Sequence, residues 1–356
     1  MIDLRFNYPV LPEQDAQFRA ALAMLPPTDE YLRMSPPGGY PADQAQAAAW
    51  LARPGYPVAA EQVQLCHGGH HALHVIALAA RLAGQVVVAD PLTYNGFLAV
   101  ADLLGIQVLA CPTDANGMLP DALADLCRAQ SVRAVYLMPT LHNPLGTVMP
   151  LARRQALVAV AREFDLLLLD DDAYGFLEPS APPSFAHLAP ERSFYIYSLA
   201  KPIAPGIRLA YLVAPVTRRM AVEAAIRATI SGSVVLLARL VGEWLADGAL
   251  TRLIAAKQAE AARRQALVRQ VFGPNIAYST RPTSFHVWVP LPPATDVAAL
   301  QARLLGQGVD LVTSLAYRAE PTVSLAGLRL ALGNVPDAAT LTQGLTLVAQ
   351  QVRTLV

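Results

Sequence analysis

Short hydrophobic runs alternate with helical segments over the first two thirds of the chain. Six of these runs, apolar on both faces, cover residues 85–90, 106–112, 133–140, 165–172, 193–198 and 207–215. Segments such as PLARRQALVAVAREF (150–164) lie between them. This pattern is typical of strands in a mainly parallel sheet that is covered by helices on both sides. We therefore predict a large α/β domain.

The pattern changes after about Val222, where long helical segments replace the alternation. Short strands are predicted in SFHVWVPLP (284–292) and GLRLALG (327–333), and a final helix from about Asp337 to Leu355. These elements predict a smaller α+β domain, against which the first 30 or so residues can pack. We expect a large domain over residues 36–254 and a small domain made of residues 1–35 together with 255–356.

Composition favours a large buried core and a small organic substrate. Hydrophobic residues make up 54% of the chain and charged residues 15%, and 27 basic residues balance 27 acidic ones. This balance removes the simplest argument for a nucleic acid or an anionic membrane as partner. No segment offers 18 uninterrupted apolar residues, and the N-terminus does not resemble a signal peptide. Cys66, Cys111 and Cys127 are too widely spaced to suggest disulfides or zinc, so we expect a cytoplasmic protein.

Polar residues at the ends of the predicted strands are candidate site residues, because ligands collect at the carboxyl ends of parallel strands. Gly68 and Gly69 lead into a helix after QVQLC, where backbone N–H groups can approach an anion, although such a pair is often only a turn. Tyr94 can stack on a planar ligand or be an ordinary half-buried aromatic residue. Asn143 can offer an amide to a ligand or serve turn formation in NPLG.

Three consecutive carboxylates follow the apolar run DLLLL. At least one of Asp170, Asp171 and Asp172 must be partly buried, so a cationic partner such as Mg²⁺ or a protonated heterocycle is required. Alternation along the strand sends Asp171 to the face opposite Asp170 and Asp172, which disfavours one metal cage. Four histidines at residues 67–74 lack a nearby carboxylate or cysteine that would complete a ligand set, so we predict no metal site.

The run FYIYSLAKPIAPGIRLAY (194–211) contains a hydroxyl, an amine and a guanidinium among apolar residues. Ser198 and Arg208 can form a phosphate site together with a helix start. Apolar surroundings should lower the pKa of Lys201 and make it a nucleophile that forms imines. These groups require a phosphorylated carbonyl compound with a ring and a basic nitrogen, and pyridoxal 5'-phosphate has all of these features.

In its motifs and their order the chain resembles the class I/II aminotransferases of fold type I. The resemblance runs from IDLRFNYP to GLRLALGNV and is strongest to the group near the α-aminoadipate aminotransferases and the aminotransferase-like domain of MocR regulators. It implies a seven-stranded, mainly parallel sheet between helices plus a smaller α+β domain. It also implies pyridoxal 5'-phosphate as cofactor and a homodimer with its sites at the subunit interface.

The resemblance also assigns roles to the cofactor residues. SLAKPIAPGIR matches the family's lysine motif, which implies Lys201 as the internal aldimine lysine and Ser198 and Arg208 as phosphate ligands. DDAY matches the motif that places Asp171 on the pyridine nitrogen and Tyr174 on the phenolic oxygen O3'.

Further motifs imply the remaining contacts. Asn143 matches a second O3' donor, which also borders the substrate, and Gly69 and His70 of GGH match phosphate contacts. Tyr94 matches the residue that stacks on the ring, and Arg329 matches the small-domain arginine that binds the substrate α-carboxylate through two parallel hydrogen bonds. Asn7 lies near the position of a substrate-contacting glycine, so we expect it in the substrate pocket.

The chain departs from the family pattern at four places, one of which is Asp43-Gln44, where the family has Leu-Arg. Met34 stands where relatives usually carry a tyrosine that reaches the cofactor phosphate across the dimer interface. His70 replaces the usual glutamine, and TSFHVW (283–288) replaces a common Gly-Gly turn. These departures concern phosphate binding and substrate placement.

Three functions follow from the resemblance. The first is an aminotransferase acting between an α-amino acid and a 2-oxo acid through a Lys201 aldimine. The second keeps the cofactor for another reaction at the amino-acid Cα, as a lyase, decarboxylase, racemase, cyclase or oxidase. The third is a regulatory module that binds the cofactor without catalysis, as in MocR proteins. Because the resemblance starts within ten residues of the first residue and the net charge is zero, we do not expect DNA binding.

Overall fold

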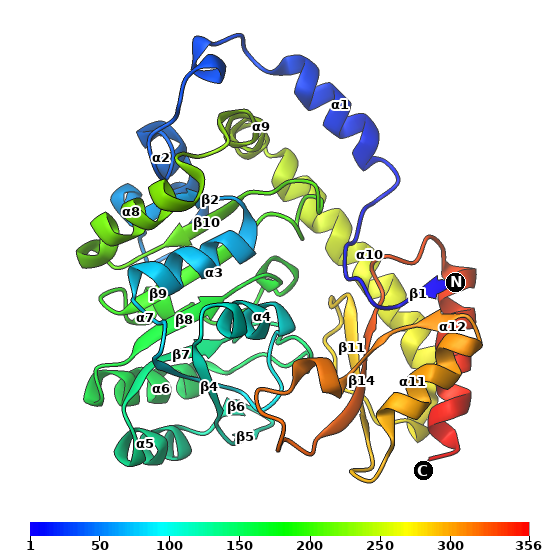
Figure 1. Ribbon diagram of the computed structural model, residues 1–356. Coiled ribbons are helices and arrows are strands. Elements are labelled where there is room, and N and C mark those ends of the chain that lie inside the picture. Colours follow the sequence, from blue (N-terminus) through cyan, green and yellow to red (C-terminus); the bar gives the residue numbers. More distant parts are fainter. Residues whose placement is uncertain (356) are drawn as a thin grey trace.

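The computed structural model describes residues 1–355. A seven-stranded sheet lies at the centre of the larger part of the molecule. Its order is β2-β10-β9-β8-β7-β3-β4 (Figure 1). The strands are β2 (Val63–Cys66), β3 (Val86–Ala89), β4 (Gln107–Ala110), β7 (Val132–Leu137), β8 (Leu167–Asp171), β9 (Ser193–Ser198) and β10 (Ala210–Val213). Strand β10 is antiparallel to both neighbours, and all other neighbours are parallel. The prediction of a mainly parallel sheet is confirmed.

Helices cover both faces of this sheet (Figure 1). They are α2 (Pro41–Leu51), α3 (Gly68–Ala79), α4 (Asn95–Leu103), α5 (Pro120–Ala129), α6 (Leu151–Glu163), α7 (Phe185–Leu188), α8 (Arg219–Ile230) and α9 (Val235–Ala246), and a small hairpin joins β5 (Thr113–Asp114) to β6 (Gly117–Met118). None of the helices within residues 1–355 is both long enough and apolar enough to cross a membrane.

Side chains alternate between the two faces along each strand. In β8, Leu167 and Leu169 join the core cluster that includes α3 and α4, whereas Leu168 joins the cluster that includes α5 and α6. Because successive side chains point to opposite faces, Asp171 points toward the α3 side and Asp170 toward the α7 side.

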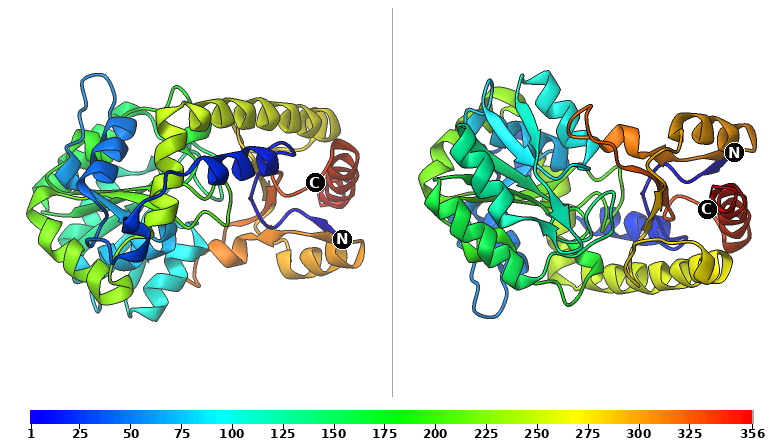
Figure 2. Two further views of the ribbon diagram at one scale, coloured as in Figure 1. Left: turned by 90° about the horizontal axis from the view of Figure 1, so that it is seen from above. Right: turned by 90° about the horizontal axis from the view of Figure 1, so that it is seen from below.

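A second hydrophobic core lies in the C-terminal part of the chain. It is built on an antiparallel sheet in the order β11-β14-β13. Its elements are β11 (His286–Leu291), β12 (Val309–Asp310), β13 (Val312–Thr313), β14 (Ala326–Ala331), α11 (Val297–Gly306) and α12 (Ala338–Arg353). Figure 2 shows this smaller part beside the larger part, with the long helix α10 (Ala249–Phe272) extending from one to the other.

The N-terminal segment contacts both parts of the molecule. Strand β1 (Ile2–Asp3) pairs in parallel with β12, and the Leu4 carbonyl accepts a hydrogen bond from the Ala331 amide at 2.7 Å. Helix α1 (Gln14–Met24) packs instead against α9, where the rings of Phe18 and Trp244 meet edge to face. We propose the division into residues 36–254 and residues 1–35 with 255–356, with the border inside α10.

Main-chain hydrogen bonds tie the two parts together near the carboxyl end of β3. The Thr93 amide donates to the Tyr317 carbonyl at 2.8 Å, and the Ala319 amide donates to the Pro91 carbonyl at 3.0 Å. Tyr317, at the end of the short helix η6 (Ser314–Tyr317), is fully buried in a cluster with Leu92 and Trp288. These contacts place the small sheet over the strand ends of the large one.

Candidate active site

One cavity collects the polar residues that were predicted at the strand ends. Its lining includes nine predicted residues and four others: Gly69, His70, Tyr94, Asn143, Asp171, Tyr174, Ser198, Lys201 and Arg208, with Tyr8, Met138, Ala173 and Ala200. Apart from Tyr8 and Arg208, they follow or end β2, β3, β7, β8 and β9. Tyr8 lies in the N-terminal segment, and Arg208 lies two residues before the start of β10. The cavity therefore lies at the carboxyl edge of the parallel strands, where a ligand site is expected.

The turn before α3 offers donors to an anion. Gly68 has a φ of +82°, and a Cβ atom there would lie 3.2 Å from the guanidinium carbon of Arg208, so glycine permits this approach. At Gly69 a Cβ atom would lie 3.7 Å from the Cβ atom of Ser198, an ordinary contact distance, so Gly69 faces Ser198. The first turn of α3 has no side-chain cap, and Arg208 has no carboxylate partner within residues 1–355. Free N–H groups, a hydroxyl and a guanidinium therefore converge as they would on a phosphate.

Asp171 is the carboxylate that reaches the cavity. Its Oδ2 accepts a hydrogen bond from the hydroxyl of Tyr136 at 2.8 Å, and the Tyr136 ring stacks on Phe97 with ring centres 3.8 Å apart. Burial raises the pKa of Asp171 to about 6, while the Tyr136 hydroxyl and the charge of Lys201 favour its ionised form. A buried carboxylate of this kind suits a protonated ring nitrogen. Sequence reasoning missed Tyr136, although its hydroxyl is the only polar side-chain group in AVYLM (134–138).

The other two carboxylates of the DDD run lie outside this cavity. Asp170 Oδ2 accepts the Phe185 amide at 2.8 Å, and Asp172 Oδ2 accepts the hydroxyl of Tyr195 at 2.8 Å. Burial raises the pKa of Asp170 to about 7, and the nearby guanidinium of Arg154 opposes this shift. Within residues 1–355 no group of three histidine, cysteine, aspartate or glutamate side chains could hold a metal ion.

Lys201 lies in the turn after β9 and points into the cavity. Its Nζ donates to the main-chain carbonyl of Asn7 at 2.9 Å and lies 3.6 Å from the ring centre of Tyr8. Burial, together with the charges of Arg329 and Arg208, lowers the pKa of Lys201 to about 7. A neutral amine is therefore accessible near neutral pH, which agrees with the expectation from its apolar neighbours.

Asn143 and Tyr174 are both about 5% exposed and lie on the same cavity wall. His286, on β11 of the small sheet, donates from Nε2 to the carbonyl of His142 at 3.0 Å, and its ring lies 5.2 Å from that of Tyr174. Burial lowers the pKa of His286 to about 3, so the imidazole is neutral. His286 stands in the segment that departs from the family's Gly-Gly turn, and it anchors the loop that carries Asn143.

His70 contacts Tyr94. His70 Nε2 and the Tyr94 hydroxyl lie 2.7 Å apart, and burial lowers the pKa of His70. A Cβ atom at Gly96 would lie within 2.5 Å of both side chains, so this arrangement requires glycine at residue 96. The His70 side chain therefore orients the tyrosine, while its main-chain amide stays in the first turn of α3.

Arg329 and Asn7 do not line this cavity directly. Arg329, 7% exposed on β14, donates from Nε to the Tyr317 hydroxyl at 2.7 Å and from Nη2 to the Arg5 carbonyl at 2.8 Å. Asn7 is 4% exposed, and neither atom of its amide group has a hydrogen-bond partner within residues 1–355. An unsatisfied buried amide is costly, so Asn7 suits a ligand that supplies a partner. Tyr317 was not foreseen from the sequence.

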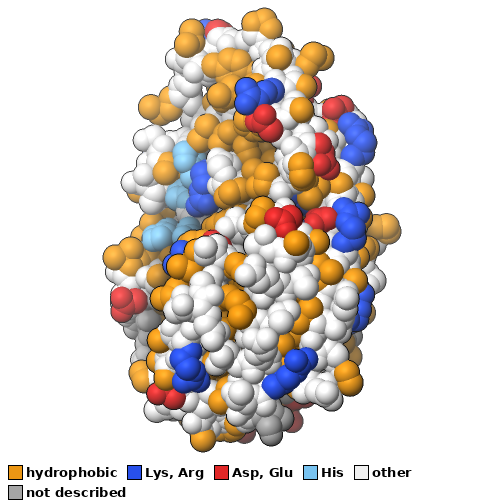
Figure 3. Space-filling model, turned by 90° about the vertical axis from the view of Figure 1, so that its right-hand side faces the viewer, with side chains coloured by type: hydrophobic (Ala, Val, Ile, Leu, Met, Phe, Trp, Pro, Cys, Tyr) orange, Lys and Arg blue, Asp and Glu red, His pale blue; other side chains and the backbone are white. Residues whose placement is uncertain are grey.

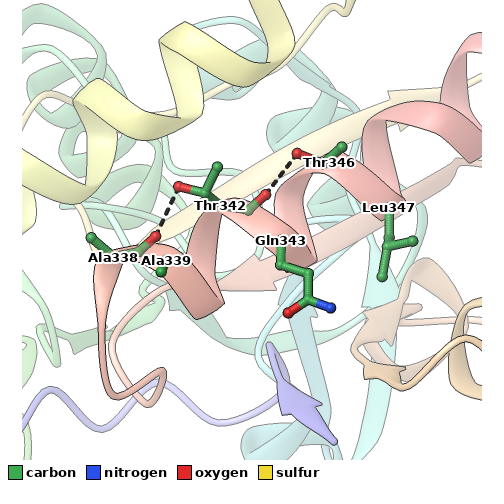
Figure 4. Close-up of a pocket in the computed structure, with 6 residues that line it drawn as sticks. All are labelled: Ala338, Ala339, Thr342, Gln343, Thr346 and Leu347. Carbon is green, nitrogen blue, oxygen red and sulfur yellow. Dashed lines mark hydrogen bonds between the residues drawn. The ribbon is translucent and has the colours of Figure 1, made fainter.

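A second hollow, on the surface of α12, lacks such groups. It is lined by Ala338, Ala339, Thr342, Gln343, Thr346 and Leu347 (Figure 4). Its two threonine hydroxyls donate to main-chain carbonyls one turn earlier, each at 2.8 Å (Figure 4). Since none of its side chains is ionisable, we place the functional site in the cavity at the strand ends.

Comparison with known proteins defines the class to which this fold and site belong. The profile of aminotransferase class I and II matches residues 1–339, and the chain belongs to this family. It is 29% identical over 315 residues to the 2-aminoadipate transaminase of Thermus thermophilus, covering 85% of this chain and 77% of that protein. It is also 27% identical over 227 residues to the uncharacterized HTH-type transcriptional regulator YdeF of Bacillus subtilis, covering 63% of this chain and 48% of the regulator. The chain thus spans about half of that regulator.

Solved structures agree with the sequence comparison. The α-aminoadipate aminotransferase of Thermus thermophilus, complexed with N-(5'-phosphopyridoxyl)-L-leucine, matches with a TM-score of 0.88 and 25% identity, covering 100% of this chain and 92% of that one. The predicted family and the fold type I architecture are confirmed, and the ligand in that solved structure is a derivative of the predicted cofactor, pyridoxal 5'-phosphate. The anion donors at α3, the carboxylate of Asp171 and the amine of Lys201 match the phosphate, the ring nitrogen and the carbonyl carbon of this cofactor in their chemistry.

Proposed function

We propose that the protein transfers an amino group between an α-amino acid and a 2-oxo acid, with pyridoxal 5'-phosphate held in the cavity at the strand ends. The observation that carries this proposal is that a buried amine with a lowered pKa (Lys201), a buried carboxylate (Asp171) and a guanidinium without a carboxylate partner within residues 1–355 (Arg208) line the same cavity. The relationship to a transaminase over most of its length supports it.

Each residue has a separate task in this proposal. When bound, pyridoxal 5'-phosphate supplies a carbonyl carbon that condenses with amines and a ring that accepts electrons released from the substrate Cα. Ser198, Arg208 and the main-chain amide of Gly69 bind the phosphate. Asp171 holds a proton on the ring nitrogen, and Tyr136 orients its carboxylate.

The remaining residues control proton transfer and substrate orientation. In its neutral form the Lys201 amine would take up the proton from the substrate Cα and hold it for return. Tyr174 and Asn143 would hold the phenolic oxygen of the cofactor, and Tyr94, which His70 orients, would lie against its ring. Arg329 and Asn7 bind the substrate carboxylate. The small sheet, which contacts the large part near the carboxyl end of β3, would limit the access of water to the cavity.

The proposal is tested by mixing the cofactor-loaded protein with single amino acids in the absence of any oxo acid. Transamination predicts stoichiometric conversion of the cofactor to its amine form, read from the absorbance spectrum, with one 2-oxo acid released per site. Ammonia, carbon dioxide or peroxide formed over many turnovers would contradict it. Such products would support a lyase, decarboxylase, cyclase or oxidase instead.

Arg329→Gln is expected to raise the KM for amino acids about 10- to 100-fold, because a charged pair with the substrate carboxylate contributes about 1.5–3 kcal/mol. Steady-state kinetics over a range of amino acids measures it. Amines without a carboxylate should react equally well with both proteins. Tyr317→Phe is the matched control, since it removes only the hydroxyl that accepts from Arg329 Nε, and a smaller rise is expected. Equal KM values in Arg329→Gln and wild type would exclude this role.

A second candidate function is the cofactor-binding part of a transcriptional regulator, which the relationship to HTH-type regulators supports. It predicts cofactor binding without sustained turnover between amino and oxo acids. Salt-sensitive retardation of specific promoter DNA by the full-length protein would favour this candidate, and many turnovers per site would favour the enzyme.

We also propose a homodimer in the cytoplasm. Figure 3 shows hydrophobic side chains gathered in the upper half of one face of the molecule. Large apolar side chains stay exposed on the chain between α1 and α2, with Leu32 at 89% and Met34 at 79% exposure. Such exposure supports an interface between copies, and Met34 stands where relatives reach across it. Sedimentation velocity tests the dimer, and the three free thiols agree with a reducing compartment.

A further inference from the structure

The chain contains only two lysines, and they are in contact. Of the 27 basic residues, 25 are arginine, and the lysines are Lys201 and Lys257. Lys257 lies in the middle of α10 and is 0% exposed. Its Nζ donates to the main-chain carbonyl of Lys201 at 3.0 Å and to that of Ile203 at 2.7 Å. The two lysines are 56 residues apart in the sequence and belong to different elements.

Lys257 has no acidic partner to explain its burial. No carboxylate forms a salt bridge with it in the part of the chain that the structure describes, and its two hydrogen bonds both go to the turn that carries Lys201. Gln14, on α1, supports the same turn, because its Nε2 donates to the Ile203 carbonyl at 2.7 Å. Burying an amine costs free energy unless hydrogen bonds compensate for the lost water. The carbonyls of Lys201 and Ile203 provide these hydrogen bonds and therefore explain why Lys257 can be buried here.

We propose that Lys257 is a positioning residue for Lys201, which holds the 201–203 turn through both carbonyls and so aims the Lys201 amine into the cavity. The inference rests on the role proposed above for Lys201. Residues 199–203 follow the end of β9 and lie outside the strands and α-helices. Within the turn the Ile203 amide donates to the Leu199 carbonyl at 3.0 Å, and the carbonyls of Lys201 and Ile203 are satisfied by the side chains of Lys257 and Gln14.

The chemistry of the amine explains why lysine and not arginine stands at residue 257. A guanidinium stays protonated at every physiological pH, whereas an ammonium can lose a proton and still keep two N–H donors. Two donors match the two carbonyls. Burial lowers the pKa of Lys257 to about 7, so this neutral form is accessible. Lysine can therefore hold the turn without placing a permanent charge beside the Lys201 amine.

The small number of lysines makes the proposal directly measurable. Apo-protein carrying lysine labelled with ¹³C at Cε should give two lysine signals by NMR, one of which disappears in Lys257→Met. In that variant the remaining Lys201 signal should move, and its pKa should rise toward the ordinary value, because a released turn exposes the amine to water. The charged and titratable groups that face Lys201 from other elements and stay unchanged are Tyr8, His70, Asp171, Tyr174, Arg208, His286 and Arg329. The charge of Lys257 itself also lowers the pKa of Lys201, so part of the rise in Lys257→Met comes from the lost charge. Lys257→Gln loses the same charge but keeps two N–H donors, so a larger rise in Lys257→Met than in Lys257→Gln measures the release of the turn, and equal rises would overturn the proposal.

Kinetics supplies the second measurement. Lys257→Met should lower kcat about tenfold or more while KM for the amino acid stays within about twofold, since misplacement affects the reacting amine and not substrate binding. Lys257→Gln keeps a neutral side chain with two N–H donors and should lie between wild type and Lys257→Met, and it carries the test if Lys257→Met does not fold. Lys257→Arg should not restore kcat.

Gln258→Met is the matched control on the same helix. Gln258 also donates from its side chain to a main-chain carbonyl, that of Phe176 at 2.7 Å, away from the 201–203 turn. The Gln258→Met variant should have a lower melting temperature, but its Lys201 signal should not move. An unchanged Lys201 signal and pKa in Lys257→Met would overturn the proposal, whether or not the protein proves to be a transaminase. A moved signal in a protein without transaminase activity would leave the positioning role and remove only the proposed reaction.

Discussion

Lys201→Ala is expected to lower kcat for transamination by about 10⁴-fold or more. The variant loses both the amine that holds the cofactor carbonyl and the base that moves the proton at the substrate Cα, and each contribution is large. Single-turnover absorbance measurements with a reactive amino acid give the rate. Cofactor binding should persist in weakened form, because the proposed phosphate ligands, Ser198, Arg208 and the start of α3, are unchanged in this variant.

Lys201→Arg separates charge from proton transfer at the same position. A guanidinium keeps the positive charge but cannot give up its proton in this pH range, so it cannot act as the base. We expect it to be about as inactive as Lys201→Ala. Borohydride reduction of wild-type protein should attach the cofactor to the peptide that contains Lys201, and neither variant should be labelled there. Labelling of Lys257 in place of Lys201 would contradict the assignment.

Asp171→Asn is expected to lower kcat about 10²- to 10³-fold, the range for loss of one preorganised electrostatic contact. An amide cannot keep a proton on the ring nitrogen, so the ring accepts electrons poorly. The change is nearly isosteric and leaves an acceptor for the Tyr136 hydroxyl, so the fold should be retained. Rates of the half-reaction measured with cofactor-saturated protein separate this chemical effect from weaker binding.

Tyr136→Phe is the matched comparison for Asp171. It removes the hydroxyl that donates to Asp171 Oδ2 but keeps the ring that stacks on Phe97. Because that hydrogen bond favours the ionised carboxylate, the variant should raise the pKa of Asp171 above about 6 and lower the rate far less than Asp171→Asn does. Equal rates in Asp171→Asn and wild type would remove Asp171 from the mechanism.

The central sheet and its strand ends could be predicted well because they are recorded in local patterns. The run 193–198 coincides with β9 (Ser193–Ser198), and the run 165–172 contains β8 (Leu167–Asp171). Alternation along β8 was enough to separate Asp171 from Asp170. These features depend on neighbours in the sequence, so a single chain contains the information.

The residues that were missed depend on register between distant elements. Tyr136 on β7 pairs with Leu169 on β8, and Leu169 lies two residues before Asp171. This register brings the Tyr136 hydroxyl within reach of the Asp171 carboxylate. His286 reaches the carbonyl of His142 across the two sheets, and Tyr317 reaches Arg329 by the packing of η6 on β14. No pattern within one segment reports such distances. The packing of α1 on α9 belongs to the same class, since its sequence does not indicate which surface it will contact.

Helix α10 has a consequence for how the molecule unfolds. Leu250 and Leu253 belong to the core of the large part, and Val268 and Phe272 belong to the core of the small part. Melting of either core would expose one end of a helix whose other end is still packed, so the two cores are expected to unfold in one cooperative transition. A ligand that binds among the strand ends would then protect the C-terminal sheet from hydrogen exchange as well, although it never touches most of that sheet.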